Sequence, residues 1–478
     1  MNFSAQLGHN SIIRLVQESA ADLGLETYLI GGYVRDLLLK RDSKDLDFVC
    51  VGSGISLAMQ VAEKAGLKGK VTIFKHFGTA MVHIDGLDVE FVGARRESYR
   101  SDSRKPLVED GTLEDDQNRR DFTINALAIS MNSANFGELI DPFGGVEDLR
   151  KKIIRTPLDA DITFSDDPLR MMRAVRFASQ LGFDIEPDTF EAIKRNAERL
   201  KIISQERTTE ELNKIILSQT PSYGFKLLFH SDLLHQFFPE MVALQGVDTI
   251  NGNTHKDNFY HTLQVLDNVA KVSSDLWLRW AAILHDIAKP PTKRYDPKVG
   301  WTFHGHEDKG ARMVPSLFRR LKLPLNEPMR FVQNLVRMHL RPIALVKDVV
   351  TDAAIRRVLF EAGEDIDALM QLCRADITSK DHSRVSRYLT NFDRVEAKMK
   401  EVEERDQLRN FQPPISGEDI MGYFQLKPGK EVGEIKEAIR EAIIEGIIPN
   451  EREKAFQLMI QVGQQKGLVF NSNYDEKK

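Results

Sequence analysis

Cysteine is scarce in this chain: its 478 residues include two cysteines, Cys50 and Cys373, far apart in the sequence. This scarcity excludes the disulfide framework of small secreted domains and indicates reduced thiols, so we expect a cytoplasmic protein. Long apolar runs are missing as well, and without about 18 consecutive apolar residues we expect no helical membrane span. The first residues lack a basic segment followed by an apolar core, so we also expect no secretory signal.

Neither sign of charge is in large excess. The chain has 66 Lys and Arg residues against 71 Asp and Glu residues, which gives a net charge of −5. This balance neither indicates nor excludes a nucleic-acid partner, because such binding depends on local basic surface rather than on the sum. Hydrophobic residues make up 42% and charged residues 29% of the chain, as in a soluble globular protein. The length predicts about two to four domains.

What the sequence does contain is a dense group of motifs near its start, in Tyr28–Val51. An apolar run predicts a short buried strand, and DLDFV further on alternates polar and apolar residues. In an extended strand this alternation turns Asp45 and Asp47 to one face. Two carboxylates that face the same way repel each other, and a divalent cation removes that cost. Hard oxygen ligands suit magnesium.

Between the two predicted strands lies GGYVRD. The backbone N–H groups of Gly31 and Gly32 can face a phosphate, and Arg35 can serve as a second anchor. The stretch as a whole therefore predicts a site for a magnesium–nucleotide complex. The alternative is a plain glycine turn beside a surface pair of aspartates.

Three further strands are predicted at 71–74, 79–84 and 87–92. In the last of them Glu90 alternates with Val89 and Phe91, so its carboxylate can share the face of Asp45 and Asp47. Three carboxylates on adjacent strands are what a two-metal phosphoryl-transfer site needs. Alternatively, Glu90 is a solvated strand residue.

Polar sequence with five basic residues follows in Ala94–Asn118 and predicts a flexible basic loop that can reach phosphate or RNA. The next segment is RRDFTINALA. If it is helical, Arg120, Asp121 and Asn125 line one face of it.

A second polar cluster is DDPLRMMRAVRF. Asp167 before Pro168 predicts a helix start, because proline is tolerated at the first helical position. Arg170, Arg173 and Arg176 then share a broad face of the helix. The alternative is that Asp167 only caps the helix and that the arginines form a solvated face.

Histidines and aspartates on separate predicted helices form a third group. An adjacent His-Asp pair at the end of an apolar helix is unusual, since burying both costs free energy without a partner or a metal. Imidazole and carboxylate together suit transition metals such as manganese, nickel, iron or zinc. The predicted ligands of this centre are His261, His285, Asp286, His306, His339 and Asp376.

In this order and spacing, GGYVRD with DLD, RRDFTINALA and DDPLRMMRAVRF resemble the class II tRNA nucleotidyltransferases. That family includes CCA-adding enzymes and bacterial poly(A) polymerases, within the polymerase-β-like superfamily. The histidine and aspartate set resembles an HD phosphohydrolase domain. The resemblance covers nearly the whole chain. The family often has Glu where this chain has Asp166.

The resemblance implies an α+β fold with four parts. A small nucleotidyltransferase head with a mixed β-sheet spans 1–153, and a helical neck and body for base recognition and RNA binding span 154–250. An HD metal-binding domain spans 251–385, and a helical tail that binds tRNA spans 386–478.

The resemblance also implies roles for the residues. Asp45 and Asp47 bind Mg²⁺, with Glu90 as a third carboxylate, and Gly32, Arg35 and Arg120 hold the triphosphate. Asp167 and Arg170 recognise the base, with Arg173 and Arg176 nearby. Cytosine and adenine both show an amino donor beside a ring-nitrogen acceptor, which an aspartate and an arginine complement. A wrong base leaves these polar groups unpaired and is rejected.

The implied function is template-independent addition of CMP and AMP, from CTP and ATP, to the 3′ end of tRNA. Poly(A) polymerase and CC-only or A-only enzymes share these motifs, and the full-length segment 94–118 favours complete CCA. The rival of another class is an HD phosphohydrolase, with a second divalent transition metal, whose head is secondary. A non-catalytic RNA-binding protein would require a broken carboxylate set.

Overall fold

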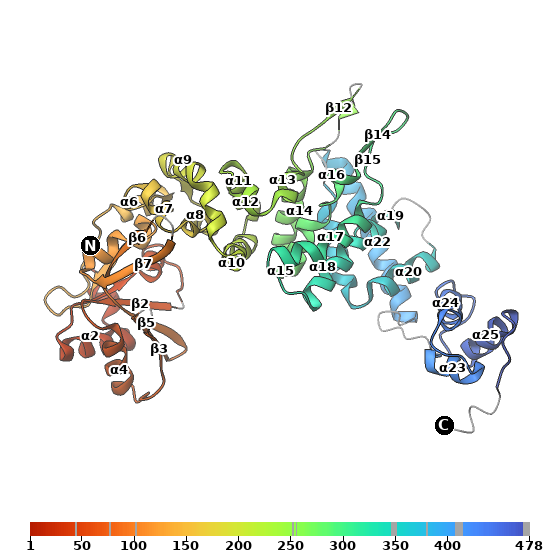
Figure 1. Cartoon of the computed structure of the whole chain (residues 1–478), viewed down its shortest axis with the longest axis horizontal. Coiled ribbons are helices and arrows are strands. Elements are labelled where there is room, and N and C mark those ends of the chain that lie inside the picture. Colours follow the sequence, from red (N-terminus) through yellow and green to blue (C-terminus); the bar gives the residue numbers. More distant parts are fainter. Residues whose placement is uncertain are drawn as a thin grey trace. The chain divides into compact units, whose positions relative to one another are not determined.

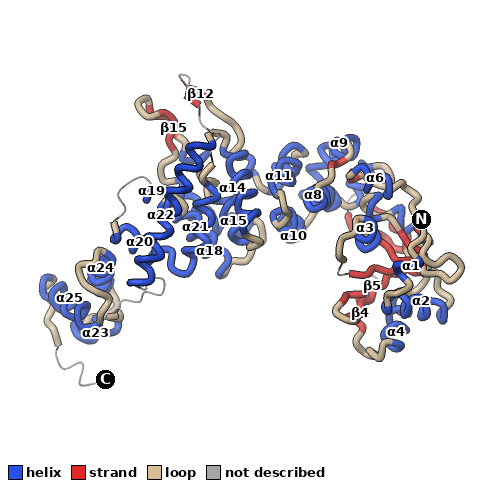
Figure 2. Tube along the Cα trace, turned by 180° about the vertical axis from the view of Figure 1, so that it is seen from behind, coloured by secondary structure: helices blue, strands red, loops and turns tan. Residues whose placement is uncertain are grey.

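The computed structural model forms two compact units, Met1–Val242 and Ala243–Lys478 (Figure 1). Strands are gathered in the first unit, whereas helices make up most of the second (Figure 2). None of the helices in the part of the chain described here is long and apolar enough to cross a membrane. The described residues are 1–43, 45–75, 78–100, 103–250, 253–254, 256–345, 351–378, 381–406 and 414–471.

The first unit is built on a mixed sheet of seven strands in the order β3-β4-β5-β2-β1-β8-β9. Only β2 and β5 run parallel among these neighbours, and the other pairs are antiparallel. The strands 28–30, 71–74, 79–84 and 87–92 predicted from the sequence are confirmed to within one residue at each end. The strand bounds are β1 Thr27–Ile30, β2 Asp45–Cys50, β3 Val71–Phe74, β4 Thr79–Ile84, β5 Leu87–Gly93, β8 Ala128–Ser130 and β9 Leu139–Ile140.

Helices α2 (Ser11–Leu23) and α4 (Gly54–Lys64) contact each other, and α4 packs on β4 and β5. The apolar periodicity of the sequence predicts one amphipathic helix over 4–24 that Gly24 ends. The structure corrects this prediction, because α1 (Ser4–Leu7) ends at Gly8. Asn10 then starts α2, where its side chain accepts hydrogen bonds from the N–H groups two and three residues ahead. Gly24 ends α2 in the left-handed conformation, as its position predicted.

The predicted flexible loop over Ala94–Asn118 was also wrong. Its described residues form a hairpin of β6 (Arg95–Arg100) and β7 (Ser103–Asp110), followed by α5 (Leu113–Asn118). Opposite charges face each other across the hairpin, since Arg95 pairs in register with Asp110 and Arg96 with Glu109. Such cross-strand pairs favour the ladder. The acidic residues of the segment complement its basic residues, so the basic residues alone did not predict its structure.

The segment RRDFTINALA is not a helix. It contains only the short 3₁₀ turn η2 (Thr123–Asn125). Further helices complete the first unit, and α8 starts directly after Pro168, as predicted. Their bounds are α3 Gly32–Leu38, α6 Gly145–Lys151, α7 Ala160–Asp166, α8 Leu169–Leu181, α9 Pro187–Asn196, η3 Ala197–Ile202, α10 Gln205–Ile216, α11 Pro221–His230, α12 Leu233–Phe237 and α13 Pro239–Val242, with the small pair β10 Ile153–Ile154 and β11 Asp184–Ile185.

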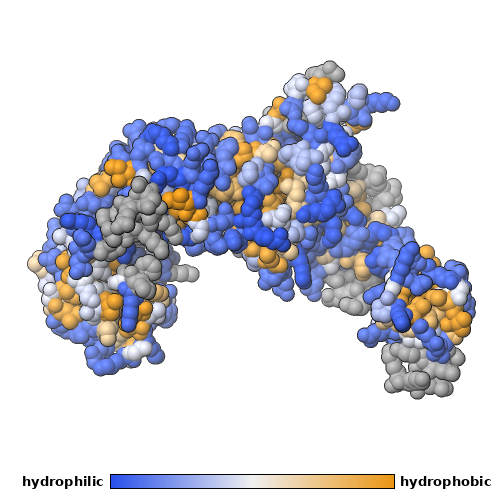
Figure 3. Space-filling model, in the orientation of Figure 1, coloured by the Kyte–Doolittle hydropathy of each residue, from blue (hydrophilic) through white to orange (hydrophobic). Residues whose placement is uncertain are grey.

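The second unit is helical apart from two small hairpins, β12 (Thr249–Ile250) with β13 (Asn253–Thr254) and β14 (Arg294–Asp296) with β15 (Gly300–Thr302). On the face seen in Figure 3, apolar side chains gather over α23–α25, where Ile447 is 75% exposed. The helix bounds are α14 Asn258–Val272, α15 Leu276–Leu284, α16 Lys289–Thr292, α17 His306–Arg320, α18 Glu327–Met338, α19 Arg341–Leu345, α20 Asp352–Ala362, η4 Gly363–Asp365, α21 Ile366–Asp376, α22 His382–Asp406, α23 Gly417–Phe424, α24 Lys430–Ile444 and α25 Arg452–Gln465.

Candidate functional site

The three predicted carboxylates of the head lie on two neighbouring parallel strands. Asp47 of β2 is in register with Glu90 of β5, and Asp45 lies two residues before Asp47 on the same face. Asp45 and Glu90 are exposed, whereas Phe48 and Phe91 are buried on the opposite face and stack at 5.7 Å between ring centroids. The apolar face of the two strands therefore fixes the direction in which the carboxylates point.

These carboxylates are crowded. Burial raises the pKa of Asp47, Arg120 opposes this, and Glu90 and Asp45 raise it again, so that it reaches about 6. The repulsion indicates a place where positive charge is missing, and oxygen donors on one face fit a hard divalent cation. The donor set is therefore compatible with Mg²⁺.

Gly31 brings the backbone close to this cluster. Its φ of +78° is a conformation that favours glycine. A Cβ atom at this position would lie 3.1 Å from Nη1 of Arg120 and 3.4 Å from Oδ2 of Asp47. Gly31 thus leaves room for an arginine and a carboxylate, at the start of the helix that begins at Gly32.

Arg120 forms an ion pair with Asp116, a residue that was not predicted from the sequence. Asp116 is fully buried in α5, and its Oδ2 accepts a hydrogen bond from Nε of Arg120 at 3.0 Å. Its Oδ1 accepts one from Nε of Arg119 at 2.9 Å. Burial opposes ionisation of Asp116, but Arg120 and Arg119 lower its pKa. The spacing of three and four residues from Asp116 to Arg119 and Arg120, which directly follow α5, was the signal that could have revealed it.

Arg35 is fixed by three neighbours. Its guanidinium donates to both carboxylate oxygens of Asp36 at 2.9 Å and to Oδ1 of Asn125 at 2.9 Å. It also lies over the ring of Phe177, with 5.2 Å from Cζ to the ring centroid. Asn125 in turn donates to Oδ1 of Asp121 at 3.1 Å. The structure therefore brings Arg35, Asp121 and Asn125 together, although the segment that carries the last two is not helical.

The arginines of α8 each have a defined partner. Arg173 pairs with Asp121 at 2.6 Å and Arg176 with Glu211 of α10 at 2.6 Å. Burial opposes ionisation of Asp121, but Arg173 and Asn125 lower its pKa to about 2. Glu211 was not predicted from the sequence, because it lies 35 residues from Arg176 on another helix.

The predicted base-recognising residues lie at the start of α8. Oδ1 of Asp167 accepts a hydrogen bond from the N–H of Leu169 at 3.2 Å. Nη2 of Arg170 donates to the carbonyl oxygen of Arg119 at 2.6 Å. This bond ties the start of α8 to the RRD segment.

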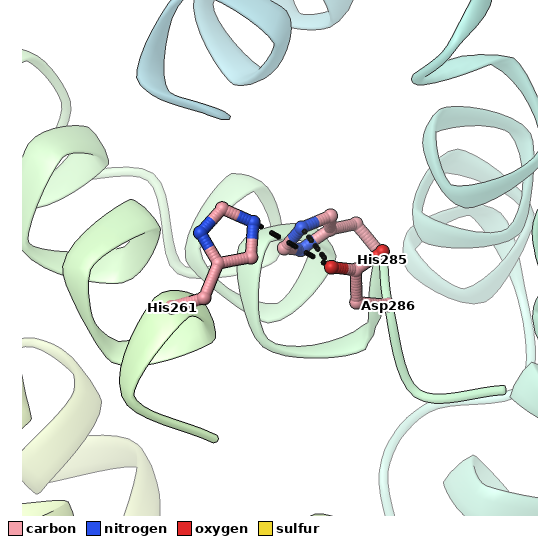
Figure 4. Close-up of side chains that lie close together, drawn as sticks. All are labelled: His261, His285 and Asp286. Carbon is pink, nitrogen blue, oxygen red and sulfur yellow. Dashed lines mark ion pairs between the residues drawn. The ribbon is translucent and has the colours of Figure 1, made fainter. Parts of the chain in front are cut away.

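In the second unit, the six predicted histidines and aspartates converge around Asp286. Its Oδ2 lies 3.5 Å from Nε2 of His261 and 3.2 Å from Nε2 of His285 (Figure 4). Its Oδ1 lies 3.3 Å from Nε2 of His306 and 3.9 Å from Nε2 of His339. The donor atoms within each of two groups, His261–His285–Asp286 and Asp286–His306–His339, all lie within 4.8 Å of one another.

Helix ends position most of these ligands. His285 follows α15, His339 follows α18, and His306 is the first residue of α17. Asp376 is the last residue of α21, and its Oδ1 lies 2.9 Å from Nε2 of His261.

The imidazoles are oriented for metal binding. Nδ1 of His285, His306 and His339 each lies 2.6 to 2.8 Å from the carbonyl oxygen three residues earlier. Because a carbonyl only accepts, Nδ1 carries the proton in the neutral ring and Nε2 keeps its lone pair. Nε2 of His285 is buried and makes no hydrogen bond to a described residue. Nε2 of His306 lies 3.3 Å from Nε2 of His339. A buried nitrogen that makes no hydrogen bond and two nitrogens that face each other fit a metal between them.

The charges around His285 agree with this arrangement. Burial works against a charged His285, but Asp286 and Asp376 raise its pKa to about 10. Burial also works against the charge on Asp286, but His285 and Lys289 lower its pKa well below the usual range. The two carboxylates therefore require positive charge at this point, which a divalent cation supplies.

Comparison with known proteins shows which protein family this chain belongs to. The model named "Poly A polymerase head domain" matches residues 27–155, "Probable RNA and SrmB-binding site of polymerase A" matches 182–244, and "HD domain" matches 258–381. An A-adding tRNA nucleotidyltransferase of Deinococcus radiodurans is 34% identical over 69% of this chain and 75% of its own length. The chain belongs to the tRNA nucleotidyltransferase and poly(A) polymerase family.

Other relatives agree. A multifunctional CCA protein of Shewanella frigidimarina is 34% identical over 63% of this chain and 70% of its own length. The crystal structure of the Bacillus stearothermophilus CCA-adding enzyme in complex with CTP is 25% identical, with a TM-score of 0.65 over 97% of this chain and 98% of that one. The α+β fold expected from the sequence is confirmed, and the family depends on divalent metal ions.

Proposed function

We propose that the protein adds CMP and AMP, from CTP and ATP, to the 3′ end of tRNA without a nucleic-acid template. The observation that carries the proposal is the register of Asp47 with Glu90, on the face of Asp45 and beside Gly31 and Arg120. The relatives named above as A-adding, multifunctional CCA and CCA-adding enzymes support it.

In this proposal Asp45, Asp47 and Glu90 hold Mg²⁺. When bound there, magnesium would lower the pKa of the RNA 3′-hydroxyl and neutralise charge on the leaving pyrophosphate. Gly31 and Gly32 let the triphosphate approach the backbone at the start of α3, and Arg35 and Arg120 neutralise it. Little covalent chemistry is asked of the protein, so most of the rate enhancement comes from positioning and charge.

Asp167 and Arg170 select the base, as acceptor and donor for the amino group and ring nitrogen of cytosine or adenine. The hydrogen bond from Arg170 to the carbonyl oxygen of Arg119 supports this role, because it fixes Arg170 next to Arg120, which we assign to the phosphates. The ion pairs of Arg173 and Arg176 hold α8 in place beside them.

One incubation tests the product. The protein is mixed with tRNA that ends before CCA, Mg²⁺, CTP and ATP, and the 3′ ends are sequenced. Ends in CCA support the proposal. Ends in CC, in a single A or in a long A tract would assign it to the CC-adding, A-adding or poly(A) branches instead.

We propose a second activity, hydrolysis of phosphate esters at the centre around Asp286, with a divalent transition metal held by the six converging ligands. The Nε2 atom of His285, which is buried and makes no hydrogen bond to a described residue, supports this second activity. The test is hydrolysis of a 2′,3′-cyclic nucleotide with added nickel or manganese, which His285→Ala should abolish. Retained hydrolysis in that variant would contradict the assignment.

The division into head (1–153), neck and body (154–250), HD domain (251–385) and tail (386–478) remains our proposal. So does the tail as a tRNA-binding part. A cytoplasmic location is also proposed. It is supported by Cys50 and Cys373, both buried free thiols.

A further inference from the structure

A cavity of about 1100 Å³ lies inside the first unit, and the roles above leave most of its wall unexplained. It is formed by α3 with the residues after it, by the C-terminal end of α8, and by the turn between α10 and α11. Arg35 and Arg176 stand on its wall. The opposite wall, which includes Tyr223 and Lys226, belongs to the segment that matches a probable RNA-binding site.

The cavity is lined by four cations and three carboxylates, and two of the cations are not held in ion pairs within the described chain. Arg35 is paired with Asp36 and Arg176 with Glu211. Arg41 and Lys226 also line the cavity, and both are exposed. Neither forms an ion pair with another residue of the described chain. Two cations of this kind in one concave surface suit consecutive phosphates of a nucleic-acid strand.

The rest of the cavity wall carries side chains that suit the base and the ribose of a nucleotide. The ring of Tyr223 is half-buried, and its hydroxyl donates to Oδ1 of Asp184, with 2.8 Å between the oxygens. The ring of Phe177 lies at the other side, beneath the guanidinium of Arg176 at 4.1 Å. The ring of Tyr223 gives a base a surface on which to stack, whereas the ring of Phe177 is buried beneath arginines, and Thr220 adds an exposed hydroxyl that can meet ribose.

Most of this cavity is separate from the proposed site of the incoming nucleotide, as its distances along the chain from Asp45 and Asp167 show. Asp42 lines the cavity and lies three residues before Asp45, so the chain itself keeps the two within about 11 Å. The cavity meets α8 at Arg176–Gly182. Asp167 lies before the other end of this 13-residue helix, which is about 18 Å long. A nucleotide with its base at Asp167 and its phosphates at the carboxylates meets this cavity at Arg35 and leaves the wall of Tyr223 and Lys226 free for the other substrate.

We propose that this cavity holds the last nucleotides of the RNA that is extended, with Lys226 and Arg41 on the phosphates and Tyr223 against a base. The inference rests on the proposed nucleotide addition to RNA and assigns a site to its acceptor substrate. The 3′-hydroxyl then reaches the carboxylates from the side of Asp42, while the incoming nucleotide is bound along the first turns of α8.

The test compares Lys226→Gln and Arg41→Gln with Lys201→Gln, an exposed lysine of the same unit that does not line the cavity. Initial rates of CMP addition are measured with varied RNA and with varied CTP, at several salt concentrations. We expect the KM for RNA to rise about fivefold to tenfold in each cavity variant, with the KM for CTP unchanged. The slope of log KM for RNA against log salt should fall by about 0.7 for each cation removed, because a single-stranded end is bound. Lys201→Gln should match the wild type.

Three other results would overturn the inference. A rise in the KM for CTP alone would place the incoming nucleotide in the cavity. An unchanged salt slope in both cavity variants, or equal effects in Lys201→Gln, would mean that the cavity contacts no phosphate. If the wild-type protein adds no nucleotide to RNA at all, the proposed function itself fails, and that outcome is visible before any variant is made.

Discussion

The two candidate metal centres of this chain differ in their donor atoms, in the secondary structure that carries them and in their exposure to solvent. The centre of the head consists of carboxylates on two strands, and Asp45 and Glu90 are exposed. The centre of the second unit consists of imidazoles and carboxylates at helix ends, where His285 is 0% and Asp286 2% exposed. Exposed oxygen donors suit a metal that arrives with each nucleotide, whereas a buried set of nitrogen and oxygen donors suits a metal that stays bound.

The surrounding charges differ as well. In the head, arginines supply the positive charge near the carboxylates, and each of Arg35, Arg120 and Arg173 is fixed by a carboxylate of its own. In the second unit, backbone carbonyls orient the imidazoles instead. The first arrangement is made to bind a polyanion, and the second to hold a metal in a rigid geometry.

The largest expected effect is at Asp47. Asp47→Ala should lower CMP addition by about 10³-fold or more, because the crowded carboxylates no longer hold a cation at the reacting phosphate. Single-turnover incorporation of CTP measures it. The metal content of the second unit should stay the same if the two centres are independent. Near-normal incorporation would refute the role of Asp47.

The reverse test is at His285. His285→Ala should weaken metal retention in the second unit by about 100-fold or more, since one ligand and its fixed geometry are lost. Elemental analysis after dialysis measures the bound metal, and CMP addition should be unchanged. His304→Ala is the matched control, because His304 is exposed and forms no ion pair or hydrogen bond with the cluster. Equal metal loss in both variants would contradict the assigned ligand set.

A smaller effect is expected at Asp167, where base choice rather than chemistry should change. Asp167→Ala should reduce the preference for CTP over UTP by about 10- to 100-fold, because the acceptor for the amino group is removed. The ratio of kcat/KM for the two nucleotides measures it. The same ratio in wild type and variant would show that another residue selects the base.

The smallest effect is expected at Asp116, whose buried carboxylate pairs with Arg120. Asp116→Asn leaves two guanidiniums without their buried counter-charge, so the unfolding free energy should fall by about 3 kcal/mol. Asp115→Asn is the matched control: it affects the exposed pair with Arg96 and the helix cap, and should destabilise the protein less than Asp116→Asn. Thermal unfolding compares the two. If Asp115→Asn destabilises more, Asp116 does not have the proposed role.

Local order in the chain was readable from the sequence. Alternation in DLDFV and DVEFV predicted which carboxylates share a face, because the period of a strand is two. The glycine at the end of α2 and the proline before α8 predicted their boundaries for equally local reasons. The histidine and aspartate set was also recognised, since few other functions explain a His-Asp pair at the end of an apolar helix.

Partners distant in sequence were decided only by the tertiary structure. Glu211 meets Arg176, and Phe177 meets Arg35, across many residues of intervening chain. In the hairpin over 95–110, residues of opposite charge face each other on two strands. The order of charges along the sequence does not reveal this pairing. A sequence thus determines which groups face one way along a strand or helix, but only packing brings separate elements to the same point, as it does around Asp286.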